Sequence, residues 1–213
     1  MQVDHVFVMC DVGAPEAEAL ARLGLREGPP NTHPGQGTAC RRFFFLDTYL
    51  ELVWVHDEAE ARSEGVAPTR LWERWSGRHA GACPFGIVLR DGRDAPPWST
   101  WPYRPSYLPP GEAIAFEQST TMSQPEILYA SFLHAGARAG GAPDDRALSP
   151  GSLTHVRVDL PDVTCLSPAA SRLQADGIAE FAAGRYLLHL AFDGAGPGRR
   201  ADLRPALDVI LDW

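Results

Sequence analysis

The stretch that decides the fold is DHVFV at residues 4–8, which returns as THVRV at residues 154–158. Both stretches alternate between apolar and other side chains, the pattern of a half-buried β-strand, and a helix-forming segment follows each of them. The copies are 150 residues apart (155 − 5), which places His155 at the same pleat position as His5. A repeated strand with a histidine at one position predicts two related modules with a pseudo-symmetric site between them.

The length and composition are those of an ordinary globular protein. A chain of 213 residues suffices for one domain of usual size, or for two small domains that share a core. Hydrophobic residues make up 45% and charged residues 22%, which excludes intrinsic disorder. The net charge of −8 argues against nucleic acid or an anionic membrane as the partner, because both bind basic surfaces. No apolar run approaches the roughly 20 residues that span a bilayer.

The N-terminus and the cysteines indicate a cytoplasmic protein. Residues 1–10 lack a basic segment followed by a long apolar one, so we expect no signal peptide. The four cysteines, Cys10, Cys40, Cys83 and Cys165, are widely spaced and form no CxxC pair. This spacing favours reduced thiols over a disulfide framework or a thiolate zinc site.

The first segment predicts a strand, a helix and two further strands. We expect the first strand at residues 3–10 and a helix with an apolar stripe at 17–25. A loop rich in proline and glycine follows at 28–37. The next strands are expected at 38–46 and 49–55, joined by a tight turn.

The middle segment is less regular. Residues 57–78 are expected to be helical, and a short strand follows at 85–89. The stretch at 96–110 holds too many prolines for a regular helix or a central strand. Two more strands are expected at 113–118 and 127–133.

The last segment repeats the plan of the first. A linker or exposed loop is expected at 135–150, followed by a strand at 153–160. Ser167 with Pro168 then predicts the N-terminus of a helix at 169–175. The strands that follow are expected at 178–181, 186–192 and 207–213.

This order of elements predicts an α+β fold, in which βαβββ modules pack into a cupped, mainly antiparallel sheet flanked by helices. Residues 1–134 are expected to form one domain, with a first module at 1–56 and an irregular second module at 83–134. A third βαβββ-like module at 151–213 is expected to pack on the same domain.

Alternation along the strands selects the candidate site residues. Leu50 and Leu52 share one face of their strand, so Glu51 lies on the opposite, concave face, where we also expect His5. Aligning LEL at 50–52 with LDV at 207–209 places Asp208 opposite Glu51, as His155 stands opposite His5. Two imidazoles and two carboxylates can chelate a divalent metal or act as acid–base pairs.

Each candidate also has a purely structural interpretation. His5 at the start of a strand can serve as a hydrogen-bonded core residue, and Glu51 can form a salt bridge with Arg41, Arg42 or Arg104. His155 can lie on an exposed face and Asp208 at the rim of the site. His33 can simply shape its glycine-rich turn. Cys40 can be a reactive thiol or a small buried hydrophobic residue.

Aromatic residues are concentrated after residue 96 of the chain. Trp98, Trp101, Tyr103 and Tyr107 surround Arg104 in the sequence. They form either a loop packed over the sheet or a lid, in which the rings shape an apolar pocket and Arg104 binds a carboxylate or enolate oxygen.

Three stretches in the first quarter of the chain resemble the vicinal oxygen chelate superfamily, specifically its glyoxalase-like branch: VDHV at 3–6, HPGQGT at 33–38 and YLELV at 49–53. The resemblance implies paired βαβββ modules that form a cupped sheet around a metal. It also implies that each module supplies a histidine from its first strand and a glutamate from its last, and His5 and Glu51 match those positions.

The second module departs from that family pattern. Its first strand, at 83–87, contains no histidine, and its later strands offer Glu117 and Glu126 as carboxylates. Two alternatives follow: the third segment supplies His155 and Asp208 instead, or the site has lost part of its metal set.

The resemblance implies a small-molecule enzyme of the isomerase, lyase or dioxygenase type. A divalent metal (Fe, Mn, Ni, Co or Zn) held by His5, Glu51, His155 and Asp208 would stabilise an enolate or bind vicinal oxygens, with Glu51 also available as the base. The expected substrate contacts are Phe7, Tyr103, Arg104 and Tyr107. The alternative is a metal-free protein that sequesters a small molecule, as bleomycin-resistance members do. Dimerisation is common in the superfamily, although the third segment can supply internally what a partner module would.

Overall fold

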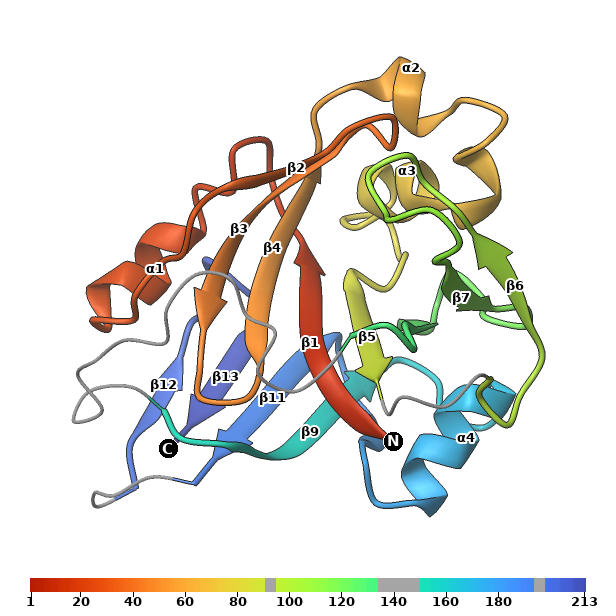
Figure 1. Cartoon of the computed structure of the whole chain (residues 1–213). Helices are drawn as coiled ribbons and strands as arrows, with labels where there is room; N and C mark the ends of the chain where they lie inside the picture. Colours follow the sequence, from red (N-terminus) through yellow and green to blue (C-terminus); the bar gives the residue numbers. More distant parts are fainter. Residues whose placement is uncertain (91–94, 134–149, 194–197) are drawn as a thin grey trace.

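The computed structural model describes residues 1–90, 95–133, 150–193 and 198–213 and contains two β-sheets (Figure 1). The strands of the first sheet are β1 (Gln2–Met9), β2 (Asn31–His33), β3 (Thr38–Phe44), β4 (Tyr49–Val55), β5 (Phe85–Arg90), β6 (Thr100–Tyr103), β7 (Ile114–Glu117) and β8 (Glu126–Tyr129). Those of the second are β9 (Leu153–Leu160), β10 (Glu180–Ala183), β11 (Leu187–Phe192), β12 (Arg200–Asp202) and β13 (Val209–Asp212). No helix in these described ranges is long and apolar enough to cross a membrane.

The first sheet consists of two related halves. Its strand order is β2-β3-β4-β1-β5-β8-β7-β6, so each half has its own first strand at the centre. In the first half β1 pairs parallel with β4, and in the second β5 pairs parallel with β8. The two halves meet where β1 pairs antiparallel with β5. The expected α+β fold with paired modules in one cupped sheet is therefore confirmed.

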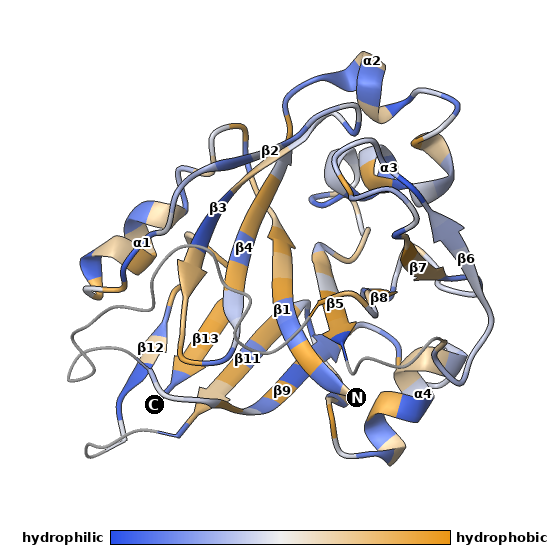
Figure 2. Ribbon diagram, in the orientation of Figure 1, coloured by the Kyte–Doolittle hydropathy of each residue, from blue (hydrophilic) through white to orange (hydrophobic). Residues whose placement is uncertain are grey.

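The two faces of this sheet have different neighbours because successive side chains on a strand point to opposite sides. On the back face, Val6 and Val8 pack in one core with the helix α1 (Ala17–Arg22) and with the second sheet. On the front face, Phe7 and Met9 belong to a separate apolar cluster. Figure 2 shows the apolar residues running along β1, β4, β5, β11 and β13, where the layers meet. The front face is left free to line a cavity.

The third segment does not repeat the topology of the first. Its opening strand β9 pairs parallel with β10 and antiparallel with β11, whereas β1 pairs parallel with the last strand of its module. Val156, Val158 and Leu160 of β9 pack against the back of the first sheet. The likeness of residues 4–8 and 154–158 therefore reflects two strands that each bury alternate apolar side chains. The prediction of a pseudo-symmetric site between the two copies is wrong.

The helix α4 (Pro168–Ala175) of the third segment covers the back of the second half of the first sheet (Figure 1). The described residues between β5 and β6 form no helix on this face. α4 therefore covers the back of the second half, as α1 covers the back of the first half. Glu117 at the end of β7 fixes its N-terminus, because its carboxylate accepts hydrogen bonds from Ser167 Oγ (2.8 Å) and from the backbone N–H of Ala169 (2.8 Å).

The helical expectation for residues 57–78 is met only in pieces. The structure has α2 (Glu58–Ala61), a 3-10 turn (Ala67–Thr69) and α3 (Leu71–Ser76). Pro68 lies in the first turn of the 3-10 helix, and Arg70, whose φ of 57° is left-handed, separates that helix from α3.

Three other expectations concern segments read as loops. The loop expected at 28–37 contains β2. The proline-rich stretch contains the strand β6, which tolerates Pro102 because it lies at the edge of the sheet. The linker expected at 135–150 lies, apart from Pro150, outside the described residues.

A buried arginine anchors α3 to the second half. Arg74 is 1% exposed and donates hydrogen bonds to the backbone oxygens of Cys83 (2.7 Å) and Gln124 (2.8 Å). It also donates to Glu126 Oε2 at 2.9 Å. Burial raises the pKa of Glu126, while Arg74 acts in the opposite direction. Glu126 is thereby committed to structure, as Glu117 is by capping α4.

Candidate functional site

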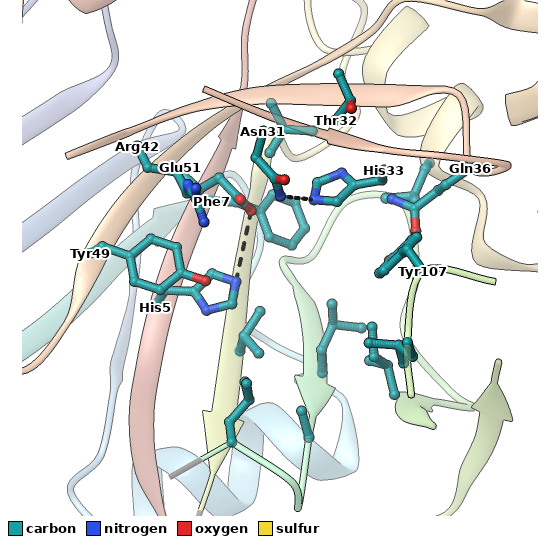
Figure 3. A pocket seen from close by; sticks show the side chains of 18 of the residues that line it. His5, Phe7, Asn31, Thr32, His33, Gln36, Arg42, Tyr49, Glu51 and Tyr107 are labelled. Carbon is teal, nitrogen blue, oxygen red and sulfur yellow. Dashed lines mark hydrogen bonds and ion pairs between the residues drawn. The ribbon is translucent and has the colours of Figure 1, made fainter. Parts of the chain in front are cut away.

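A cavity of about 400 Å³ opens on the front face of the first sheet, and we call it the cup. Its polar lining comes almost entirely from the first half and is shown in Figure 3. Its remaining wall is apolar and comes largely from the second half. The apolar lining residues include Val88, Ile114, Phe116, Leu128 and Phe132. The cup is therefore shaped for a small molecule with one polar end and one apolar end.

His5 and Glu51 lie at the polar end on the neighbouring strands β1 and β4. His5 Nδ1 is 2.9 Å from Asp4 Oδ1. His5 Nε2 is 3.8 Å from Glu51 Oε2, the contact that Figure 3 marks between these two residues. The Tyr49 ring stacks on the imidazole with centroids 4.2 Å apart. Because an ionised carboxylate only accepts hydrogen bonds, Asp4 favours the tautomer with hydrogen on Nδ1. The lone pair of Nε2 then faces Glu51.

Glu51 is buried, and its partners are not arginines. Cys40 Sγ–H donates to Glu51 Oε1 at 2.9 Å, while Oε2 faces His5. In the described part of the chain Glu51 makes no ion pair with an arginine: Arg41 binds Glu27, and Arg42 donates to the carbonyl oxygen of Pro29. Burial, and next to it the charge of Glu51, raise the pKa of the Cys40 thiol well above its usual range.

His33 comes into the cup from β2 and is held by polar neighbours on both ring nitrogens. Nδ1 is 2.8 Å from Thr38 Oγ1, and Nε2 is 3.2 Å from Asn31 Nδ2. Burial lowers the pKa of His33, so its imidazole is neutral at neutral pH. The interpretation of His33 as a residue that shapes its turn is compatible with these contacts, but the ring also lines the cavity.

Arg42 is a site residue that the sequence argument did not select. It stands opposite Glu51 in the β3–β4 register and lines the cup. Its Nε is buried and has no hydrogen-bond partner among the residues that the structure describes. The sequence contained a signal for this position: Arg42 is two residues after Cys40 on one strand, and residues two apart on a strand share a face. Arg42 places a cation beside any oxygen that enters the polar end.

The second half lacks the family's two ligand positions. A two-fold rotation about the centre of the antiparallel β1–β5 pairing relates the two halves of the sheet. This rotation places His5 at the position of Gly86 and Phe7 at the position of Val88. Phe7 pairs with Glu51, and Val88 pairs with Leu128, so Leu128 is the counterpart of Glu51. Neither glycine nor leucine can ligate a metal through its side chain.

The Phe7 ring occupies the space that a side chain at residue 86 would need. A Cβ added to Gly86 would lie 2.0 Å from Phe7 Cζ. We therefore expect Gly86→Ala to lower the free energy of unfolding by about 1–3 kcal/mol, the usual cost of overpacking. Urea denaturation measures the change. In a Phe7→Leu background the same substitution should cost clearly less, and a loss below about 0.5 kcal/mol in the wild-type background would contradict this close packing.

The structure does not bring the third-segment candidates to the cup. His155 lies on the second sheet, about half-exposed, with Nε2 3.3 Å from Glu180 Oε2. Asp208 is exposed and precedes β13. Because the apolar face of β9 packs on the back of the first sheet, its polar face cannot reach the front. The expected set of two histidines and two carboxylates from both segments does not form.

The expected substrate contacts divide into two pairs. Phe7 and Tyr107 line the cup, and Tyr107 Oη donates to Gln36 Oε1 at 2.7 Å. Tyr103 instead packs edge-on against Phe116 beneath the cavity wall, and burial raises its pKa to about 12. Arg104 is exposed and is not a lining residue. Arg42 takes the place in the cup that we expected for Arg104.

Comparisons with known proteins identify a family over the first half of the chain. The sequence model of a family described as "Glyoxalase-like domain" matches residues 3–108. No curated protein matches the chain. A solved structure of a hypothetical protein from Staphylococcus aureus is similar with a TM-score of 0.47 and 9% identity, over 99% of this chain and 97% of that one. Methylmalonyl-CoA epimerase, solved with methylmalonyl-CoA and NH4+, is similar with a TM-score of 0.41 and 13% identity, over 63% and 97%.

Proposed function

Because this chain belongs, through residues 3–108, to the glyoxalase-like branch of the vicinal oxygen chelate superfamily, we propose that it is a small-molecule enzyme whose reaction takes place in the cup. The observation that carries the proposal is the pair of His5 and Glu51, 3.8 Å apart at the polar end of the cavity. Asp4 orients the imidazole from behind, an arrangement that proteins use around metal ligands and catalytic bases.

The two donors fit a divalent metal. His5 Nε2 and Glu51 Oε2 face one another, and the other ring nitrogen of His5 is already paired with Asp4. Such an ion, held by His5 and Glu51, would supply Lewis-acid stabilisation of negative charge on a substrate oxygen. A buried carboxylate is costly unless it is paired, and in the described structure Glu51 has only a thiol and an imidazole as partners.

The lining predicts the kind of substrate. A carbonyl or carboxylate oxygen would lie beside Arg42, whose Nε lacks a partner in the described structure, while an apolar body would contact Phe116 and Leu128. About 400 Å³ is at the lower end of the range for drug-sized ligands, so the substrate is a small organic acid or carbonyl compound.

The chain's own residues can then move a proton. Glu51 is placed to take a proton from the carbon next to the substrate carbonyl, and the electron pair of the broken C–H bond moves to the oxygen beside Arg42. Return of the proton from Glu51 to a neighbouring carbon gives isomerisation. The buried apolar wall excludes water from the enolate.

A metal-free binding protein is the second candidate. The observation that favours it is the loss of the second-half ligand positions, where Gly86 and Leu128 stand. On this alternative the cup binds its ligand through Arg42 and the apolar wall, without turnover.

A metal-content experiment separates the two candidates. We expect wild-type protein loaded with Fe, Mn, Ni, Co or Zn to retain about one ion per chain after desalting. His5→Ala should retain much less, because truncation of an orienting residue alone costs about 10–100-fold in metal affinity and His5 is a ligand. The matched control is His155→Ala on the second sheet, which should retain the wild-type amount.

The opposite result would support the binding protein. If wild type retains negligible metal, and carbonyl or aromatic compounds raise its Tm without being consumed, the enzyme proposal fails.

We further propose that the protein acts in the cytoplasm on a free small molecule and not on nucleic acid or membranes. All four cysteines are free thiols, and three of them are buried, which supports a reducing compartment. The negative net charge of −8 supports the exclusion of polyanionic partners. We also propose a homodimer, and light scattering measures whether the molar mass in solution is that of one chain or of two.

A further inference from the structure

We propose that Cys40 and His33 complete the metal centre of His5 and Glu51, so that the first half of the sheet alone supplies all four protein ligands of a Zn²⁺ ion, which would take the substrate oxygen as a fifth ligand. This inference rests on the metal-dependent form of the proposed function. It replaces the second-half positions at Gly86 and Leu128, which cannot ligate, with two donors from the strands β2 and β3.

Three of these side chains lie close enough to share one ion. One ligand atom each from His33, Cys40 and Glu51 lies within 4.8 Å of the other two. The ligand atoms of one tetrahedral zinc ion are about 3.3–3.7 Å apart, given bonds of about 2.0–2.3 Å. Closing the cluster on an ion therefore requires shifts of about 1–1.5 Å, which side-chain rotation supplies. In the described structure this is the group of histidine, cysteine and acidic residues that reaches metal-ligand spacing.

Glu51 lies between Cys40 and His5. Its Oε1 accepts from Cys40 at 2.9 Å, and its Oε2 faces His5 Nε2 at 3.8 Å. The carboxylate thus connects His5, which the family pattern predicts as a ligand, with Cys40, which the family pattern does not predict. His33, Cys40 and Glu51 lie on β2, β3 and β4, and His5 lies on the adjacent strand β1, 3.8 Å from Glu51.

The Cys40 thiol differs from the other buried thiols in its hydrogen-bond partner. Cys10 and Cys83 are also buried, but among the described residues Cys40 is the cysteine whose sulfur donates to a carboxylate. A metal ion that replaces this thiol proton binds the thiolate and the carboxylate together. Thiolate and imidazole donors favour Zn²⁺ or Co²⁺, whereas Mg²⁺ and Mn²⁺ favour sites built from oxygen alone.

Cobalt titration tests the inference by a spectroscopic signal. We expect wild-type protein to bind one Co²⁺ with a near-ultraviolet charge-transfer band that requires a thiolate ligand. Cys40→Ser retains a hydroxyl donor for Glu51 and is expected to lose the band and at least about tenfold in affinity. His33→Gln should keep the band but bind about 10–100-fold more weakly. The matched control is Cys10→Ser, a buried cysteine outside the cup, which should leave the band intact.

Two results would overturn the inference, and they differ in what else they overturn. Co²⁺ bound without the band, with unchanged affinity in Cys40→Ser, would exclude Cys40 and leave the pair of His5 and Glu51 as the metal site. Absence of Co²⁺ and Zn²⁺ binding by wild type would overturn both this inference and metal dependence. Circular dichroism and thermal unfolding of each variant establish that it is folded, and Cys40→Ala serves if Cys40→Ser is not.

Discussion

Arg74→Met is expected to lower the free energy of unfolding by about 3–5 kcal/mol, the largest stability effect of any single substitution proposed for this chain. Arg74 is 1% exposed and donates hydrogen bonds to two backbone oxygens and to Glu126. Methionine fills a similar volume but donates nothing. The substitution therefore leaves a buried carboxylate and two carbonyl groups without their partner.

Urea denaturation followed by circular dichroism measures this loss. The matched control is Arg62→Met, which removes the exposed i,i+4 pair with Glu58 on α2 and should cost at most about 0.5 kcal/mol. Adding Glu126→Gln to Arg74→Met should restore part of the stability, because it removes the uncompensated charge. A loss below about 1 kcal/mol for Arg74→Met would show that α3 and the second half are not held together through this side chain.

Glu51→Gln is expected to reduce metal affinity by more than about 100-fold. Loss of a residue that merely orients a ligand costs about 10–100-fold, and Glu51 is proposed as a ligand that contacts two of the other donors, His5 and Cys40. The same change should leave the metal-free protein as stable as wild type or slightly more stable. Glutamine fills the same space and can still accept from Cys40, and it removes a buried charge.

The measurement pairs Zn²⁺ competition titration with thermal unfolding in the presence of a chelator. Glu58→Gln, an exposed carboxylate on α2, is the control and should change neither quantity. If Glu51→Gln instead lowers Tm in the chelator by many degrees while wild type binds no metal, Glu51 is a structural residue. That combination would refute its assignment as a ligand.

The sequence predicts the first half of the sheet well because its signals are local. The strand 49–55 and the helix start at residue 17 appear at the expected places, and so does the Ser167 cap. The third segment was predicted to repeat the first because its alternation and histidine match. Alternation specifies which side chains are buried but not the sheet in which a strand pairs, since pairing depends on distant residues.

The site divides in the same way. His5, Phe7 and Glu51 are found in the cup because strand periodicity determines the face of each residue. Tyr103 and Arg104 were expected there because aromatic residues surround Arg104 in the sequence; Tyr103 instead ends the edge strand β6, and Arg104 follows it as an exposed residue. Arg42 and Cys40 carry the same periodicity signal as Glu51. Arg42 was considered only as a salt-bridge partner of Glu51, and Cys40 was left between a reactive thiol and a buried hydrophobe.

The capping of α4 by Glu117 has a consequence for the order in which the protein folds during its synthesis. The cup is lined by residues between His5 and Leu133. The helix α4, which covers the back of the second half of the sheet, is synthesised after all of them. Until β9, α4 and β11 emerge, Ile87 and Ile127 face solvent or a chaperone. During synthesis, the stretch that carries the family signature therefore depends for the covering of its back face on residues that are made after it.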